Sequence, residues 1–96
     1  MLTQVMALEL SSHNINVNAV CPGYTDTDLL HNSFKMRDSD GVVSPENYQQ
    51  TLVEKVPLGR MAQPEEVAEL IAFLASDKAA YITGEAVLIA GGKEMH

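Results

Sequence analysis

Apolar residues gather in separate segments of the chain, and their spacing predicts a different element for each segment. Residues 2–10 are apolar on more than one helical stripe, which is typical of a helix buried on two sides. Residues 15–20 are rich in β-branched side chains and alternate imperfectly, so they predict a strand that Pro22 and Gly23 end. Residues 86–90 are continuously apolar, which is typical of a strand covered on both faces.

Two more helices are predicted from their start signals. Ser44–Glu46 offers a capping hydroxyl, a proline in the first turn and an acid, and this helix is expected to pass through Val56 and end before Pro57. Gln63–Glu66 starts the second helix for the same reasons. One apolar stripe follows it, made of Val67, Leu70, Ile71 and Leu74.

The predicted order is helix, strand, helical flap, helix, strand, which indicates an α/β fold with a parallel pair of strands. Residues 1–96 are interpreted as a single partial domain, because two strands do not make a stable sheet alone. Within it, residues 1–27 hold the first helix, strand and turn, residues 28–57 the flap, and residues 58–96 the last helix and strand. Long excursions such as the flap often act as lids over a site.

Charge and cysteine content exclude several classes of function. Six Lys and Arg stand against 13 Asp and Glu, a net charge of −7, so neither nucleic acid nor an anionic membrane is an expected partner. Cys21 is the single cysteine, which excludes an internal disulfide, and it is predicted to be a small buried hydrophobe. The three histidines and Cys21 share no metal-ligand spacing, so no metal site is predicted. Without a long apolar run or signal peptide, a soluble cytoplasmic protein is expected.

The turn Pro22–Thr27 is the strongest candidate for chemistry. It follows the carboxyl end of the first predicted strand, which is where open α/β sheets bind their ligands. Its backbone and its two threonine hydroxyls predict one half of a nucleotide-cofactor site.

The chain resembles the carboxyl-terminal part of a short-chain dehydrogenase/reductase in two segments, MALELSSHNINVNAVCPGYTDT and VPLGRMAQPEEVAELIAFLASDKAAYITGEAVLIAGG. The likeness weakens only over residues 29–51. It implies the carboxyl-terminal part of a Rossmann-type doubly wound parallel sheet. It also implies part of an NAD(P)-dependent oxidoreductase that interconverts an alcohol and a carbonyl, assembled as a tetramer or dimer of identical chains.

The resemblance also implies roles for residues of the turn. In the family, the positions of Pro22, Gly23, Tyr24, Thr25 and Thr27 contact the nicotinamide end of NAD or NADP. The backbone of Thr25 would hold the carboxamide, and the Thr27 hydroxyl would bond the carboxamide or the pyrophosphate. The alternative is that Thr25 and Thr27 only cap the following helix.

Motifs of the family that are missing matter as much as those present. The chain has no Gly-rich phosphate turn, and Tyr24, Tyr48 and Tyr81 have no lysine four residues later, as the catalytic Tyr-x-x-x-Lys motif requires. No catalytic residue is therefore assigned, and the chain alone is expected to be inactive. The alternative class is a non-catalytic oligomerisation module derived from the family.

Substrate contacts are expected from the flap. Its apolar side chains are more often packing residues when taken singly, but as a set they are the predicted substrate wall: Leu29, Leu30, Phe34, Met36 and Tyr48. A polyol or sugar alcohol is the expected substrate, with a 3-oxoacyl thioester as the alternative. The choice between NAD and NADP stays open.

Overall fold

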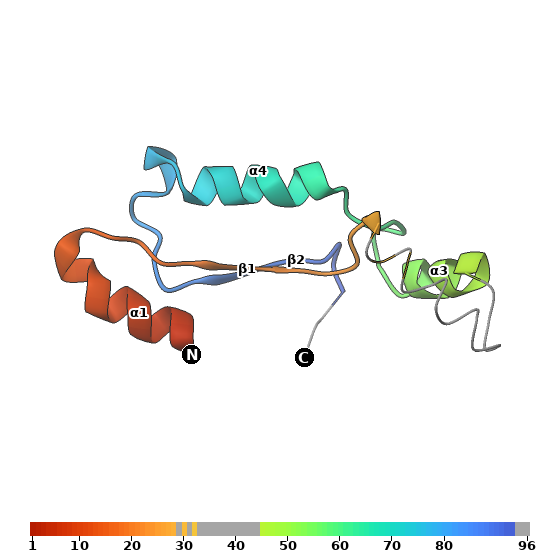
Figure 1. Cartoon of the computed structure of the whole chain (residues 1–96), viewed down its shortest axis with the longest axis horizontal. Coiled ribbons are helices and arrows are strands. Elements are labelled where there is room, and N and C mark those ends of the chain that lie inside the picture. Colours follow the sequence, from red (N-terminus) through yellow and green to blue (C-terminus); the bar gives the residue numbers. More distant parts are fainter. Residues whose placement is uncertain (29, 31, 33–44, 94–96) are drawn as a thin grey trace. The chain divides into compact units, whose positions relative to one another are not determined.

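The computed structural model describes residues 1–28, 30, 32 and 45–93 (Figure 1). The chain divides into two compact units, and each is assembled from segments that are far apart in the sequence. Unit 1 consists of Met1–Cys21 and Glu65–Ile89, and unit 2 of Pro22–Pro64 and Ala90–His96. The interpretation of residues 1–96 as a single partial domain stays a prediction.

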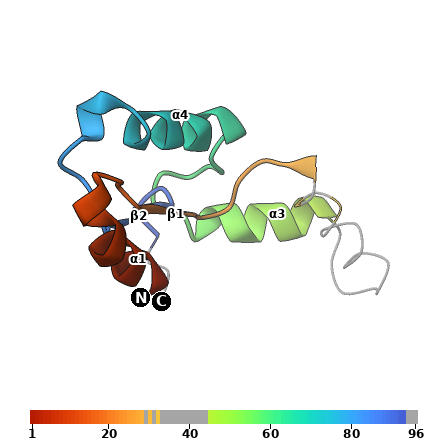
Figure 2. The same ribbon diagram turned by 60° about the vertical axis from the view of Figure 1, so that its left-hand side comes forward.

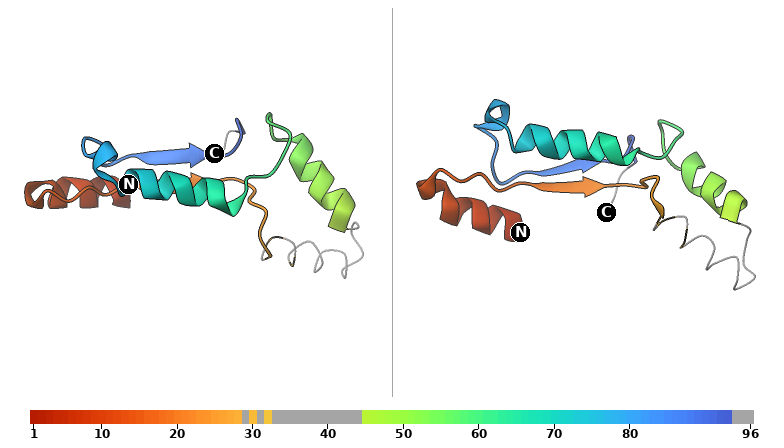
Figure 3. Two further views of the ribbon diagram at one scale, coloured as in Figure 1. Left: turned by 90° about the horizontal axis from the view of Figure 1, so that it is seen from above. Right: turned by 45° about the horizontal axis from the view of Figure 1, so that its top comes forward.

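Unit 1 is a small α/β layer structure. Its elements are α1 (Leu2–Leu10), β1 (Ala19–Pro22), α4 (Pro64–Leu74) and β2 (Ala86–Ile89), with short 3₁₀ turns at Ser11–His13 and Asp77–Ala79. Strands β1 and β2 pair directly and point the same way, and α1 and α4 lie on opposite faces of this sheet (Figures 1, 2 and 3). The predicted α/β class with a parallel pair of strands is confirmed.

The first strand begins later than predicted, because two asparagine side chains take the place of strand pairing. Asn16 Nδ2 donates to the Ala80 carbonyl oxygen at 3.1 Å. Asn18 Nδ2 donates to the Ile82 carbonyl oxygen at 3.0 Å, and its Oδ1 accepts the Glu85 N–H at 3.1 Å. Regular pairing starts only at Ala19, so the predicted bounds 15–20 are wrong and β1 covers Ala19–Pro22.

Fewer side chains of unit 1 are buried than the apolar patterns predict. In α1 only Ala7 is buried and Leu8 is 78% exposed, so the residues of this chain do not bury the helix on two sides as predicted. In β2 the side chains alternate between faces, and Leu88 remains 48% exposed. Cys21, predicted to be buried, is exposed, because the second half of β1 is uncovered within the described residues.

Unit 2 contains α3 (Pro45–Glu54) and the loop that follows it. This helix ends earlier than predicted, since Lys55 and Val56 bond to carbonyls three residues back, as in a tightened last turn before Pro57. The predicted capping residue Ser44 lies outside the described residues. The core of this unit is formed by Leu52, Val56 and Met61.

Two kinds of feature are absent from the described ranges. No helix among residues 1–28 and 45–93 has the length and apolar character needed to cross a bilayer. The same residues contain no group of three or more His, Cys, Asp or Glu side chains placed to hold a metal ion.

Candidate functional site

The turn after β1 is held in place by a neighbouring segment of unit 2. Thr25 forms an isolated parallel bridge with Ala62. In this bridge Ala62 N–H donates to the Tyr24 carbonyl oxygen at 2.9 Å, and Asp26 N–H donates to the Ala62 carbonyl oxygen at 2.8 Å. Both bonds use the residues that flank Thr25, so the N–H and C=O of Thr25 point away from Ala62. Thr25 therefore presents one donor and one acceptor on the side of the turn that faces away from Ala62.

The Thr27 hydroxyl caps the helical residues that follow the turn. Leu30 N–H donates to Thr27 Oγ1 at 3.2 Å, three residues on, which is the position an N-cap side chain serves. A hydroxyl oxygen has two lone pairs and one hydrogen, so a capping threonine keeps its hydrogen for a second partner. Thr27 therefore caps the helical residues that follow, as the alternative interpretation predicts, and this cap is compatible with binding a ligand.

Thr25 behaves differently from Thr27. Its Oγ1 donates to the Gly23 carbonyl oxygen at 3.2 Å, which closes the turn on itself, and no cap by Thr25 is seen in the described residues. The Thr25 hydroxyl is thus occupied locally, and its backbone groups are what it can offer to a ligand.

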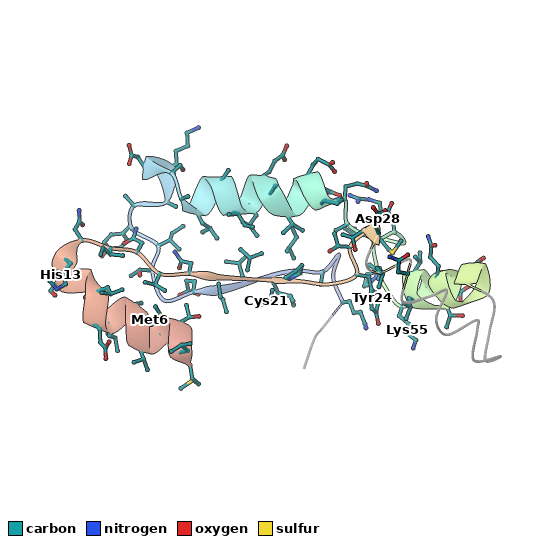
Figure 4. All side chains as sticks on the ribbon, viewed as in Figure 1. Met6, His13, Cys21, Tyr24, Asp28 and Lys55 are labelled. Carbon is teal, nitrogen blue, oxygen red and sulfur yellow. The ribbon has the colours of Figure 1, made fainter. Side chains whose placement is uncertain are left out.

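Tyr24 is held by a residue from the far end of the chain. Lys93 Nζ donates to the Tyr24 hydroxyl oxygen at 3.1 Å and lies 4.6 Å from the centre of its ring. Figure 4 shows the side chain of Tyr24 beside the turn that follows β1. Sequence reasoning missed both Lys93 and Ala62, because no local pattern links residues so far apart.

Most of the predicted substrate wall is not described. Leu29, Phe34 and Met36 lie outside the described residues, and Tyr48 lies in α3 but its side chain is not described. Leu30 is half-buried, and its backbone N–H is taken by Thr27. The substrate wall therefore stays a prediction.

The chain matches proteins of known family along nearly its whole length. The family model described as enoyl-(acyl carrier protein) reductase matches residues 1–94. The 3-oxoacyl-[acyl-carrier-protein] reductase FabG of Thermotoga maritima is 41% identical over 91 residues, which are 95% of this chain and 32% of that protein. The chain thus spans about a third of the length of the curated relatives it matches.

Solved structures show the same likeness in three dimensions. A short chain dehydrogenase family protein of Francisella tularensis superposes with a TM-score of 0.89 at 42% identity, covering 95% of this chain and 38% of that one. Sorbitol-6-phosphate 2-dehydrogenase SrlD of Erwinia amylovora superposes with a TM-score of 0.88 at 32% identity, covering 99% of this chain and 38% of that one.

These matches agree with the Pro-Gly turn, the parallel strands and the helices on both faces of the sheet, and they confirm the predicted Rossmann-type fold class. The chain belongs to the short-chain dehydrogenase/reductase family.

Proposed function

We propose that this chain supplies the nicotinamide side of the cofactor site in an NAD(P)-dependent oxidoreductase that interconverts an alcohol and a carbonyl. The observation that carries the proposal is the pair of Thr25 backbone groups that face away from the bridge with Ala62. A carboxamide presents a carbonyl acceptor and an NH2 group with two donor hydrogens, so an N–H and a C=O on one residue complement its carbonyl and one of its hydrogens.

Thr27 fits the same ligand. Its oxygen is occupied by the Leu30 N–H, which fixes the position from which its hydrogen can be donated to the carboxamide or the pyrophosphate. Pro22, Gly23 and Tyr24 shape the approach to these groups. The bound nicotinamide supplies the hydride chemistry, and this chain's residues bind and orient the ring.

A chimera tests the proposal directly. This chain replaces the matching segment of the Thermotoga maritima reductase, and reduction of a carbonyl substrate is followed with NADH and with NADPH. The chimera is expected to be active, whereas the 96-residue chain alone is expected to show no turnover. Thr27→Val, which loses the hydroxyl, should raise the cofactor KM of the chimera about tenfold, while Thr27→Ser should stay within about twofold.

Thr27→Asp separates capping from binding. Its carboxylate still accepts the Leu30 N–H but has no hydrogen to donate, so the variant should keep its stability and lose cofactor affinity. Full cofactor affinity in both Thr27→Val and Thr27→Asp would contradict the assignment. Tight binding of NAD(P)H by the isolated chain would contradict the expectation that the remaining cofactor contacts lie outside it.

The same chimera distinguishes the two substrate classes, because residues 28–57 travel with the chain. We favour a polyol or sugar alcohol, in keeping with the likeness to a sorbitol-6-phosphate 2-dehydrogenase. The alternative, a 3-oxoacyl thioester, draws support from the likeness to 3-oxoacyl reductases. Oxidation of a sugar alcohol by the chimera supports the first, and retained 3-oxoacyl reduction without it supports the second.

The exposed apolar face of α1 favours association of identical chains as a second role. Leu2 is 72% exposed and Leu8 78% exposed, and Val5 and Met6 add to the same helix. Soluble proteins rarely leave an apolar surface of this kind uncovered. The partner proposed is a second copy of this chain, whether or not the assembly is catalytic.

Sedimentation velocity checks the association. The chain should sediment as a dimer or tetramer, and Leu8→Glu should raise the dissociation constant at least about tenfold, because a buried carboxylate would replace an apolar contact. Gln50→Glu places the same charge on an exposed position of α3 and should leave association unchanged. A monomeric unsubstituted chain would refute this role.

A further inference from the structure

Lys93 makes two contacts with one aromatic side chain. Its ammonium lies 3.1 Å from the Tyr24 hydroxyl oxygen and 4.6 Å from the centre of the Tyr24 ring, and both residues are half-buried. A cation this close to an aromatic ring is attracted by the ring as well as by the hydroxyl. The ammonium therefore restrains both the position and the tilt of the ring.

The backbone that carries Lys93 is itself fixed. Leu58 N–H donates to the Gly91 carbonyl oxygen at 3.0 Å, and Lys93 N–H donates to the Ala90 carbonyl oxygen at 3.1 Å. Gly91 and Gly92 have φ of +62° and +93°, and a Cβ on either would crowd the side chains of Val56 and Pro57 respectively. Lys93 therefore follows a tight turn that packs against the loop after α3.

Tyr24 transmits this restraint to the cofactor-binding groups. Its carbonyl oxygen accepts the Ala62 N–H at 2.9 Å, and the next residue is Thr25, whose N–H and C=O face away from Ala62. With its side chain held by Lys93 and its carbonyl held by Ala62, Tyr24 has little freedom to rotate the peptide that follows. The orientation of the Thr25 backbone therefore depends on both anchors.

We propose that Lys93 is a positioning residue for the nicotinamide turn: through the Tyr24 side chain it holds the backbone groups of Thr25 in the orientation that a carboxamide needs. The part that concerns the cofactor rests on the proposed function, whereas the restraint of the turn by Lys93 can be measured without any cofactor.

Amide hydrogen exchange on the 96-residue chain tests the restraint. Lys93→Met should speed exchange of the Asp26 and Ala62 amides about tenfold, since both belong to the bridge beside Tyr24. Lys93→Arg keeps the cation and should stay within about twofold. Tyr24→Phe keeps the ring and loses the hydroxyl, so its effect should be intermediate.

The Gly84 amide is the internal control, because it bonds to the Val17 carbonyl oxygen in unit 1. Its exchange should not change in any of these variants. Unchanged exchange at Asp26 and Ala62 in Lys93→Met, equal acceleration at Gly84, or failure of Lys93→Arg to rescue would each overturn the proposal.

The chimera provides the cofactor measurement. There Lys93→Met should raise the KM for the nicotinamide cofactor about tenfold with little change in kcat, and Lys93→Arg should restore it. Accelerated exchange with an unchanged KM would overturn the role toward the cofactor. A chimera in which neither NADH nor NADPH supports turnover would refute the proposed function instead, while the exchange result would still decide whether Lys93 restrains the turn.

Discussion

Replacing Asn18 with leucine should lower the free energy of unfolding by about 2 kcal/mol, because two backbone groups lose their partners together. The Asn18 amide group donates to the Ile82 carbonyl oxygen and accepts the Glu85 N–H. Leucine has nearly the same shape but serves neither group. Urea denaturation followed by circular dichroism measures the loss.

Two further variants sharpen this expectation. Asn18→Asp keeps an acceptor for the Glu85 N–H. A charged carboxylate has no donor for the Ile82 carbonyl, so the charged variant should be about as unstable as Asn18→Leu. A protonated carboxyl can donate to that carbonyl, so the protonated variant should have a stability between those of the unsubstituted chain and Asn18→Leu. Gln4→Ala removes an exposed amide from α1 and should change stability by less than about 0.5 kcal/mol. An Asn18→Leu chain that unfolds at the same urea concentration as the unsubstituted chain would refute the role given to this amide.

Gly91→Ala should destabilise unit 2 by about 3 kcal/mol, through backbone strain and overpacking acting together. The residue has φ +62°, and an added Cβ would lie 2.7 Å from Val56 Cγ1. Val56 is only 6% exposed and belongs to the core of unit 2, so it has little room to withdraw. Hydrogen exchange of amides in residues 56–62 measures the change within this unit.

Gly59 provides the matched control. It also has positive φ, +75°, but a Cβ there meets nothing within 4 Å. Gly59→Ala should therefore cost about 1 kcal/mol from backbone strain alone. The difference between the two alanine variants isolates the steric contribution at Gly91, and equal losses would show that the contact with Val56 is relieved.

The sequence predicted an element well where the residues that start and end it lie within it or beside it. The helix over Pro64–Leu74 begins at its proline with acids in the first turn, as predicted, and the helix over Leu2–Leu10 has the predicted bounds. The strand after it was misplaced, because whether Asn16 and Asn18 bond through side chains or backbone depends on residues 79–85, which no local pattern identifies.

The same distinction applies to the candidate site. The turn chemistry and the family resemblance predict Pro22 and Thr27 as site residues, and of the two interpretations of Thr27 the structure shows the cap. The bond between Lys93 and Tyr24 joins residues 69 positions apart, so it could not be read from spacing. Exposure of Cys21 was likewise unpredictable, since burial depends on which segments cover a strand and not on the strand's own residues.

The two units alternate along the chain, and this limits how much a change in the length of one segment affects the stability of unit 1. Residues 22–64 leave unit 1 at the end of β1 and rejoin it at the start of α4, so along the chain they are a loop inserted into unit 1. The entropy of closing such a loop grows only with the logarithm of its length, about 0.6 kcal/mol for each doubling. Changes in the length of this segment that spare the core residues Leu52, Val56 and Met61 therefore cost unit 1 little stability.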